Sequence, residues 1–336
     1  MIEARLYQKK EDQKVWCYLC SHHCLIQDGK RGICGVRENQ GGTLYSLVYG
    51  KPIAAHVDPI EKKPLFHFLP GSTSYSLATA GCNFRCLFCQ NADISQVKDL
   101  KRISGEDVPP DDIVTAALQA KCQSISYTYT EPTIFFEYAY DISLLAEAQG
   151  LKNVFVSNGY MTLEMLESMH PHLQAANVDL KAFRDNFYRT QCGAKLAPVL
   201  DSLKKMKQLG VWLEVTTLII PTLNDSKEEL SELARFIAVD LGPEIPWHIS
   251  RFHPTYQLTQ LPITPVKTLQ RAWEIGKEAG LRYVYTGNVP GDAGEKTTCY
   301  HCGQLLIDRF GFSILKNNLQ QGKCPGCQTT MDGFGL

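Results

Sequence analysis

The sequence predicts an α/β protein: a partial β/α barrel with a small metal-binding segment at each end. From Ser72 onward, short runs of β-branched and aromatic residues alternate with helical patterns, which is typical of a parallel sheet. Six or seven such units are too few for an eightfold barrel, so an incomplete barrel or a doubly wound sheet fits best. Cysteine clusters on either side of this stretch divide the chain into 1–70, 71–294 and 295–336.

The boundaries of the repeating units follow from local signals. The candidate strands are 74–79, 124–129, 152–157, 176–180, 211–219, 246–251 and 282–285. Pro110 starts one helix, Ser226 and Glu229 form a capping box, and Thr264 is expected to cap a helix whose first residue is Pro265. Glycines stand where helices should end, at Gly150, Gly210, Gly242 and Gly280.

Composition restricts the class of protein. The 336 residues are 44% hydrophobic and 21% charged, as expected for a globular chain with a sizeable core. A net charge of −1 without long basic runs argues against a broad nucleic-acid surface. Residues 1–16 lack the apolar core of a signal peptide, and no stretch of about 18 apolar residues occurs. These features predict a cytoplasmic protein without a membrane partner.

Cysteine is the unusual component. There are 13 cysteines, and in a non-secreted chain metal or redox chemistry explains them better than disulfides do. Chance would give roughly half a pair with a spacing of three. Four such pairs occur: Cys17/Cys20, Cys86/Cys89, Cys299/Cys302 and Cys324/Cys327.

The central cysteine cluster directly follows the first predicted strand. Cys82, Cys86 and Cys89 form a C-x3-C-x2-C run. Three thiolates can hold three irons of a 4Fe-4S cluster and leave the fourth iron open to bind a ligand and pass it an electron. The alternatives are a zinc knuckle or buried apolar thiols.

With Phe88 before its last cysteine, this run resembles the radical SAM signature, C-x3-C-x-aromatic-C. The resemblance implies that the open iron chelates S-adenosylmethionine and that the reduced cluster cleaves it to a 5′-deoxyadenosyl radical, which abstracts a substrate hydrogen. It also implies a reductant such as a ferredoxin or flavodoxin. The protein then supplies positioning and shielding, because the cofactor carries the difficult step.

Polar residues follow successive predicted strands, and loops at the carboxyl ends of strands build the sites of β/α proteins. They are Thr130, Glu131, Ser157, Asn158, Asp179, Lys181, Arg251, His253 and Asn288. Tyr129-Thr130-Glu131-Pro132 stands where the superfamily has Gly-Gly-Glu-Pro, which receives the methionine amino group, but both glycines are missing. By resemblance to glycyl-radical activating enzymes, the ribose and carboxylate of the cofactor are lined by Ser157, Asn158, Asp179, Lys181 and His253.

The terminal cysteines form two further sets. A pattern close to a zinc ribbon is made by Cys299, Cys302, Cys324 and Cys327, with a rubredoxin-like iron or an auxiliary cluster as alternatives. The amino-terminal set fits zinc or a second 4Fe-4S cluster that feeds electrons to the first, and comprises Cys17, Cys20, Cys24 and Cys34. Cys122 is expected to fill apolar space, and Cys192 lies on the predicted active face.

The whole chain resembles the radical SAM component of the AmmeMemoRadiSam group, a branch similar to pyruvate formate-lyase activating enzymes. The motifs that carry this likeness begin at Cys17, Gly32, Tyr127, Asn177 and Cys299. The group implies Ammecr-like and Memo-like partners, but no particular reaction. Three functions stay open: hydrogen abstraction from a protein partner, modification of a small molecule or RNA, and a non-catalytic Fe-S module for electron transfer.

Overall fold

An eight-stranded sheet forms the centre of the computed structural model, which describes residues 1–96, 103, 107–289 and 291–336. Its strands are β7 (Pro52–Pro59), β8 (Thr73–Thr79), β9 (Ser124–Tyr127), β10 (Lys152–Ser157), β11 (Ala175–Asp179), β12 (Trp212–Ile219), β13 (Trp247–Arg251) and β14 (Val284–Gly287). Strands β8 to β14 are parallel and adjacent in chain order, whereas β7 pairs antiparallel with β8. This order excludes a doubly wound sheet, in which strand order reverses.

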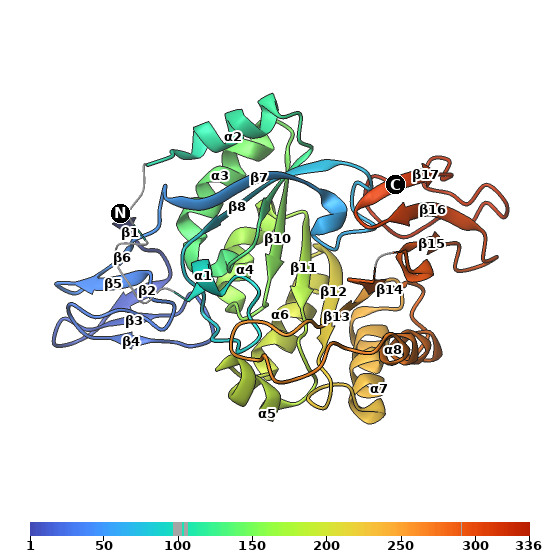
Figure 1. Cartoon of the computed structure of the whole chain (residues 1–336). Helices are drawn as coiled ribbons and strands as arrows, with labels where there is room; N and C mark the ends of the chain where they lie inside the picture. Colours follow the sequence, from blue (N-terminus) through green and yellow to red (C-terminus); the bar gives the residue numbers. More distant parts are fainter. Residues whose placement is uncertain (97–102, 104–106, 290) are drawn as a thin grey trace.

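Helices connect the parallel strands and cover the outer face of the sheet (Figure 1). The α-helices are α1 (Ala92–Ser95), α2 (Pro110–Gln119), α3 (Phe136–Ala148), α4 (Leu163–Met169), α5 (Asp185–Phe187), α6 (Ala197–Gln208), α7 (Lys227–Arg235) and α8 (Val266–Glu278). Short 3-10 or π segments are η1 (Ile60–Lys62), η3 (Pro132–Phe135), η4 (His170–His172), η5 (Tyr188–Cys192), η6 (Phe236–Leu241) and η7 (Ala293–Glu295). In the part of the chain that the structure describes, β7 and β14 do not pair, so the predicted partial barrel is confirmed.

Two of the three predicted helix starts are confirmed. Helix α2 begins at Pro110, and Ser226 caps α7 by accepting a hydrogen bond from the Glu229 amide. The third was wrong, because α8 begins at Val266 and the Thr264 hydroxyl does not cap it. That buried hydroxyl instead accepts from the Phe252 amide and donates to the Ile219 carbonyl, which joins the segments after β12 and β13.

The amino-terminal segment has two parts. Two small antiparallel sheets are formed by β1 (Ile2–Glu3), β5 (Arg37–Gln40) and β6 (Thr43–Ser46), and by β2 (Tyr7–Lys9), β3 (Val15–Cys17) and β4 (Leu25–Ile26). We call residues 1–48 the amino-terminal unit. Strand β7, which the sequence analysis did not predict, then joins the central sheet, and its register pairs His56 with Ser76. Strand β7 was hard to predict because prolines bound it and much of it is exposed.

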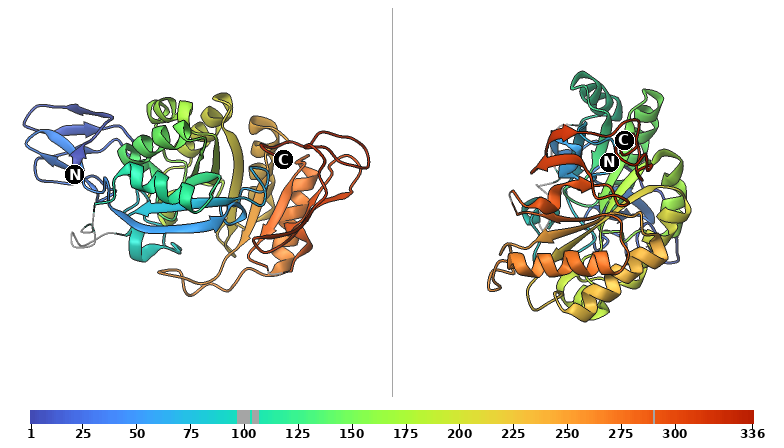
Figure 2. Two further views of the ribbon diagram at one scale, coloured as in Figure 1. Left: turned by 90° about the horizontal axis from the view of Figure 1, so that it is seen from above. Right: turned by 90° about the vertical axis from the view of Figure 1, so that its right-hand side faces the viewer.

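The two cysteine-rich units lie at opposite ends of the molecule in Figure 1 and in the left view of Figure 2. The carboxyl-terminal unit, residues 295–336, contains the sheet of β15 (Thr297–Thr298), β16 (Leu305–Phe310) and β17 (Ser313–Asn317). It is tied to the barrel by Asp332, whose carboxylate pairs with Arg282 at 2.8 Å. Within the described ranges, no helix has both the length and the apolar character needed to cross a membrane.

Candidate functional site

The central cysteine loop begins at the carboxyl end of β8 and turns at Gly81. This glycine has φ +100°, and a Cβ there would lie 2.7 Å from Val36 Cγ1 and 3.0 Å from the Cys34 carbonyl oxygen. Such contacts are too short for any side chain, so only glycine lets the amino-terminal unit approach the loop this closely. The loop that carries Cys82 is therefore built against the amino-terminal unit.

Segments far apart in sequence fix the backbone of this loop. Arg85 and Leu87 donate their amides to the carbonyls of Cys192 and Gln191 at 2.8 and 3.0 Å, so η5 packs along the loop. From the other side, the loop after β13 donates the Gln257 amide to the Leu87 carbonyl at 2.9 Å.

The amino-terminal unit supplies the remaining support. Its His22 ring donates Nε2–H to the Asn83 carbonyl at 2.7 Å, and the Arg85 guanidinium donates to the Ile33 carbonyl. A loop anchored on several sides keeps its thiols in fixed positions.

The three thiols of the loop are largely buried and have polar neighbours. Cys89 Sγ lies 3.2 Å from Ser95 Oγ, and Cys82 Sγ accepts from the Phe84 amide at 3.4 Å. Burial raises the pKa of Cys82 and of Cys89. A hydrogen bond with Cys192, and then burial, raise the pKa of Cys86. Thiols of this kind need bound cations to become thiolates, so the donor set fits iron.

Glu131 joins the loops that follow β9 and β10. Its carboxylate is 1% exposed and accepts from Thr133 Oγ1 at 2.6 Å, from Ser157 Oγ at 2.8 Å and from the Asn158 amide at 2.8 Å. Burial raises the pKa of this carboxyl, against the lowering effect of these donors. Predicted site residues Glu131, Ser157 and Asn158 thus form one cluster. Thr130 lies beside it and donates its hydroxyl to the Thr79 carbonyl at 2.8 Å.

Asn158 connects this cluster to the cysteine loop. Its side-chain amide donates to Asn83 Oδ1 at 2.7 Å and lies 3.9 Å from Cys82 Sγ. Among the described residues, Asn83 Nδ2 and Thr79 Oγ1 are buried and have no hydrogen-bond partner. Buried polar atoms without partners cost stability unless a ligand or water meets them, which fits a ligand bound at this edge of the sheet.

Tyr129 replaces the missing glycines of the superfamily motif. Its φ of +60° is the left-handed conformation that glycine adopts easily and tyrosine rarely. The ring is held below Lys63 Nζ, 4.6 Å from the centroid, and the hydroxyl donates to Asp58. Contacts of the side chain therefore stabilise a backbone shape that the sequence alone would not favour.

Asp179 and Lys181 place a cation at the end of β11. Lys181 Nζ lies 2.8 Å from Asp179 Oδ2 and 5.8 Å from the centre of the Phe88 ring. Burial alone would lower the pKa of Lys181, but the charges of Asp179, Cys86 and Cys192 raise it well above its ordinary value. A permanent ammonium group thus stands beside the cysteine loop.

The other predicted residues lie outside the Glu131 cluster and the Asp179–Lys181 ion pair. His253 is exposed on the loop after β13. Arg251 donates Nε–H to the Thr264 carbonyl at 2.8 Å, and Asn288 donates to Ser250 Oγ at 2.9 Å. Cys122 is buried after α2, away from the three sets, and Cys192 is fully buried beside Cys86.

The two terminal cysteine sets differ in geometry. At the carboxyl end, the sulfurs of Cys299 and Cys327 and those of Cys302 and Cys324 are 3.6 Å apart. All four sulfurs lie within 4.8 Å of one another, the only group of three or more His, Cys, Asp or Glu ligand atoms this compact among the described residues. The amino-terminal cysteines line one cavity without meeting that limit. The same holds for Cys82, Cys86 and Cys89.

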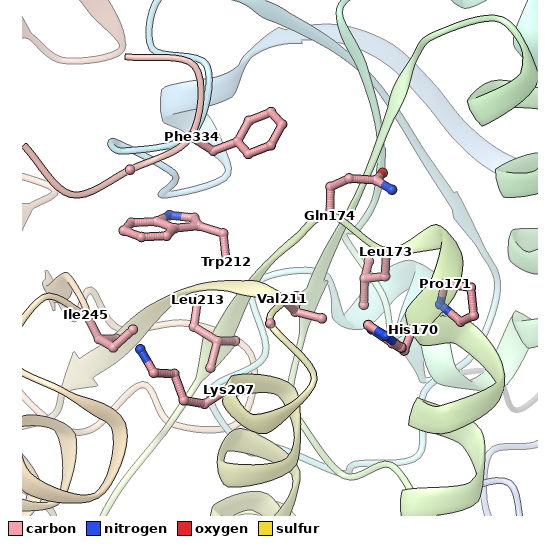
Figure 3. A pocket seen from close by; sticks show the side chains of 12 residues that line it. His170, Pro171, Leu173, Gln174, Lys207, Val211, Trp212, Leu213, Ile245 and Phe334 are labelled. Atoms are coloured by element: carbon pink, nitrogen blue, oxygen red, sulfur yellow. The ribbon is translucent and has the colours of Figure 1, made fainter. Parts of the chain in front are cut away.

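A cavity of about 420 Å³ lies at the amino ends of β11 and β12, opposite the cysteine loop. The residues that line it include Trp212, Phe334, His170, Gln174 and Lys207 (Figure 3). Sites of β/α barrels form at the carboxyl ends of strands, so we do not assign the active site here.

Sequence analysis missed residues that lie beside the thiols or hold Tyr129 in position. Asn83 lies beside Cys82 Sγ and Ser95 beside Cys89 Sγ, and Asp58 and Lys63 hold Tyr129. Asn83 lies within the cysteine motif, so sequence analysis could have identified it as a site residue. Asp58 and Lys63 were not, because nothing local shows that β7 joins the barrel.

Comparison with known proteins finds similarity in sequence and in fold. Residues 76–237 match the model of the radical SAM superfamily. An uncharacterised protein of Methanocaldococcus jannaschii is 46% identical over 99% of both chains. A pyruvate formate-lyase-activating enzyme of Clostridium pasteurianum is 26% identical over 47% of this chain and 66% of its own. A radical SAM methyltransferase structure from Sphaerobacter thermophilus shares the fold at TM-score 0.52, with 17% identity over 71% of both chains.

Proposed function

We propose that the chain, whose residues 76–237 match the radical SAM superfamily, cleaves S-adenosylmethionine at Cys82, Cys86 and Cys89 and abstracts hydrogen from a substrate. This proposal rests mainly on the cysteine loop at the carboxyl end of β8. Its thiols are buried or partly buried, and its sulfurs are less closely grouped than those of the carboxyl-terminal set. When bound, the reduced 4Fe-4S cluster supplies the electron that splits the cofactor into methionine and a 5′-deoxyadenosyl radical.

The residues around the loop then bind and orient the cofactor. Lys181 offers a charge to the methionine carboxylate, and its ion pair with Asp179 fixes the ammonium group in place. Ser157 and Asn158 are held by Glu131 at the edge where the ribose is expected. Phe88 packs on Phe187 with ring centroids 5.8 Å apart, which keeps water from the loop. His253 is exposed and supplies a donor to the carboxylate if its loop closes over the cofactor.

We propose a protein as the substrate. The support is similarity to activating enzymes, together with the two small units that flank the barrel and offer surfaces to a macromolecule. On the family resemblance, Ammecr-like and Memo-like proteins are the first candidates, and a ferredoxin or flavodoxin is the reductant. A small molecule is the second candidate substrate, and a net charge of −1 disfavours RNA.

We further propose that Cys299, Cys302, Cys324 and Cys327 hold zinc. Zn–S bonds of about 2.3 Å set tetrahedral sulfurs about 3.8 Å apart, close to the 3.6 Å separations at this site. A 4Fe-4S cluster separates its ligand sulfurs by the width of an iron cube, so it does not suit this spacing. A single rubredoxin-like iron has the zinc geometry, and metal analysis distinguishes the two.

The test is anaerobic reconstitution, reduction by dithionite and chromatography for 5′-deoxyadenosine. We expect product from wild type, none from Cys86→Ala and wild-type amounts from Cys122→Ala, which removes a buried cysteine outside the three sets. Cys327→Ala should chiefly lower the folded yield, because the metal stabilises that unit. A fully loaded, reducible wild-type cluster that yields no product, even with candidate partners added, would favour an electron carrier instead.

A further inference from the structure

The amino-terminal cysteines surround one enclosed space. Cys17, Cys20, Cys24 and Cys34 line a cavity whose other walls include the apolar side chains of Leu19, Ile26, Ile33 and Ile134. Four cysteines that line one small cavity offer the donor set of a metal centre.

Sulfur spacing indicates which metal this centre holds. No three of these sulfurs lie within 4.8 Å of one another among the described residues, and the same is true of Cys82, Cys86 and Cys89. Neither the amino-terminal set nor the central loop is as compact as the carboxyl-terminal set. The chain therefore contains one compact cysteine set and two less compact ones, and the compact set provides a comparison for the other two.

We propose that Cys17, Cys20, Cys24 and Cys34 bind a second 4Fe-4S cluster, ligated at all four irons. Full ligation leaves no iron open for a ligand, so this cluster transfers electrons and does not bind S-adenosylmethionine. Only this role rests on the function proposed above, because cluster binding follows from the geometry of the amino-terminal unit alone.

Its position suits electron delivery to the catalytic loop. The Cys34 carbonyl lies 3.0 Å from where a Gly81 Cβ would be, and Cys82 is the next residue. One peptide unit spans about 3.8 Å, so Cys34 and Cys82 are within roughly 10 Å of each other. The hydrogen bond from His22 to the Asn83 carbonyl also joins the two sites.

The outer wall of the cavity is close to solvent. Ile33, which lines it, is 45% exposed, and Cys24 is only partly buried. A one-electron donor of the ferredoxin or flavodoxin class docks on this side and loses one electron, which reduces the amino-terminal cluster. The same electron passes to the catalytic cluster, which restores the oxidised amino-terminal cluster without making or breaking a bond.

Metal analysis of a full-length variant that lacks the catalytic cluster tests the proposal. We expect Cys82→Ala/Cys86→Ala/Cys89→Ala to bind about four iron and four sulfide after reconstitution, with a reducible 4Fe-4S signal by electron paramagnetic resonance. Replacing Cys17, Cys20, Cys24 and Cys34 in that background should remove this iron. A triple variant that contains two zinc ions and no iron would overturn the proposal.

Two further measurements cover other outcomes. If the triple variant does not fold, wild type should contain about eight iron, and a value of about four would refute the second cluster. For the relay, Cys20→Ala should cleave S-adenosylmethionine normally with dithionite but at least tenfold more slowly with reduced flavodoxin. Equal rates with flavodoxin would refute the relay. Iron content of the triple variant does not depend on cleavage, so it separates failure of this proposal from failure of the proposed function.

Discussion

The ion pair between Arg37 and Glu137 fastens the amino-terminal unit to helix α3 of the barrel. Arg37 Nη1 and Nη2 donate to Glu137 Oε2 and Oε1 at 3.0 and 2.9 Å, with 2% and 1% of the side chains exposed. The Arg5 amide also donates to Glu137 at 2.7 Å. Removing one partner of a buried pair leaves an uncompensated charge, which costs about 3–5 kcal/mol. We expect Glu137→Gln to lower the free energy of unfolding by roughly that amount.

Anaerobic urea unfolding, followed by fluorescence and far-ultraviolet circular dichroism, measures this change. The control is Glu232→Gln, because Arg184 and Glu232 form the same bidentate pair at 2.6 and 2.9 Å in an exposed position. Solvent screens that pair, so its loss should shift the urea midpoint far less. Replacing Arg37 and Glu137 together by Met and Leu should recover most of the loss. A Glu137→Gln shift no larger than that of the control would refute the reasoning.

Two more predictions concern residues of the barrel region that contact the units at either end. Burial lowers the pKa of His67 to about 4, so the neutral ring contributes stability that is complete above pH 6.5 and falls as pH drops toward 4. The loss between pH 6.5 and 5 should be about 2 kcal/mol in urea titrations, and His67→Gln should flatten this slope; an unchanged slope would contradict the assignment. Gly81→Ala should destabilise the holoprotein by more than Gly150→Ala, since both have positive φ but a Cβ at Gly150 meets nothing within 4 Å. Equal unfolding midpoints for the two variants would show that the amino-terminal unit does not press on Gly81.

Local patterns predicted the barrel well because most of its parallel strands are short and buried and are followed by a clear helix signal. Strand β9 ends at Tyr127 rather than at residue 129, since Tyr129 turns to positive φ there. Strand β7 escaped notice because its sequence is not strongly alternating and its partner is known only from the fold. Thr264 was misread because a capping pattern and a buried cross-link use the same hydroxyl.

The candidate site was predictable where function depends on spacing within one loop. Cys82, Cys86 and Cys89 belong to this class, as does the order of polar residues after successive strands. The contacts that fix them were not predictable, because His22, Cys192 and Gln257 reach the loop from distant parts of the chain. Metal identity also lies beyond sequence, since C-x2-C pairs occur in both terminal sets and only the sulfur separations differ.

Arg37 links the docking of the amino-terminal unit to its metal centre. Its side chain lines the cysteine cavity and pairs with Glu137, while Glu131, at the start of the same η3–α3 segment, holds Ser157 and Asn158. A thiolate-ligated centre carries negative charge, which a buried guanidinium beside it stabilises. Loss of Glu137 should therefore weaken both docking and metal retention, so iron should leave the amino-terminal site of Glu137→Gln at lower urea concentrations than it leaves wild type. Iron retained to the wild-type midpoint would mean that the cysteines hold their metal independently of the barrel.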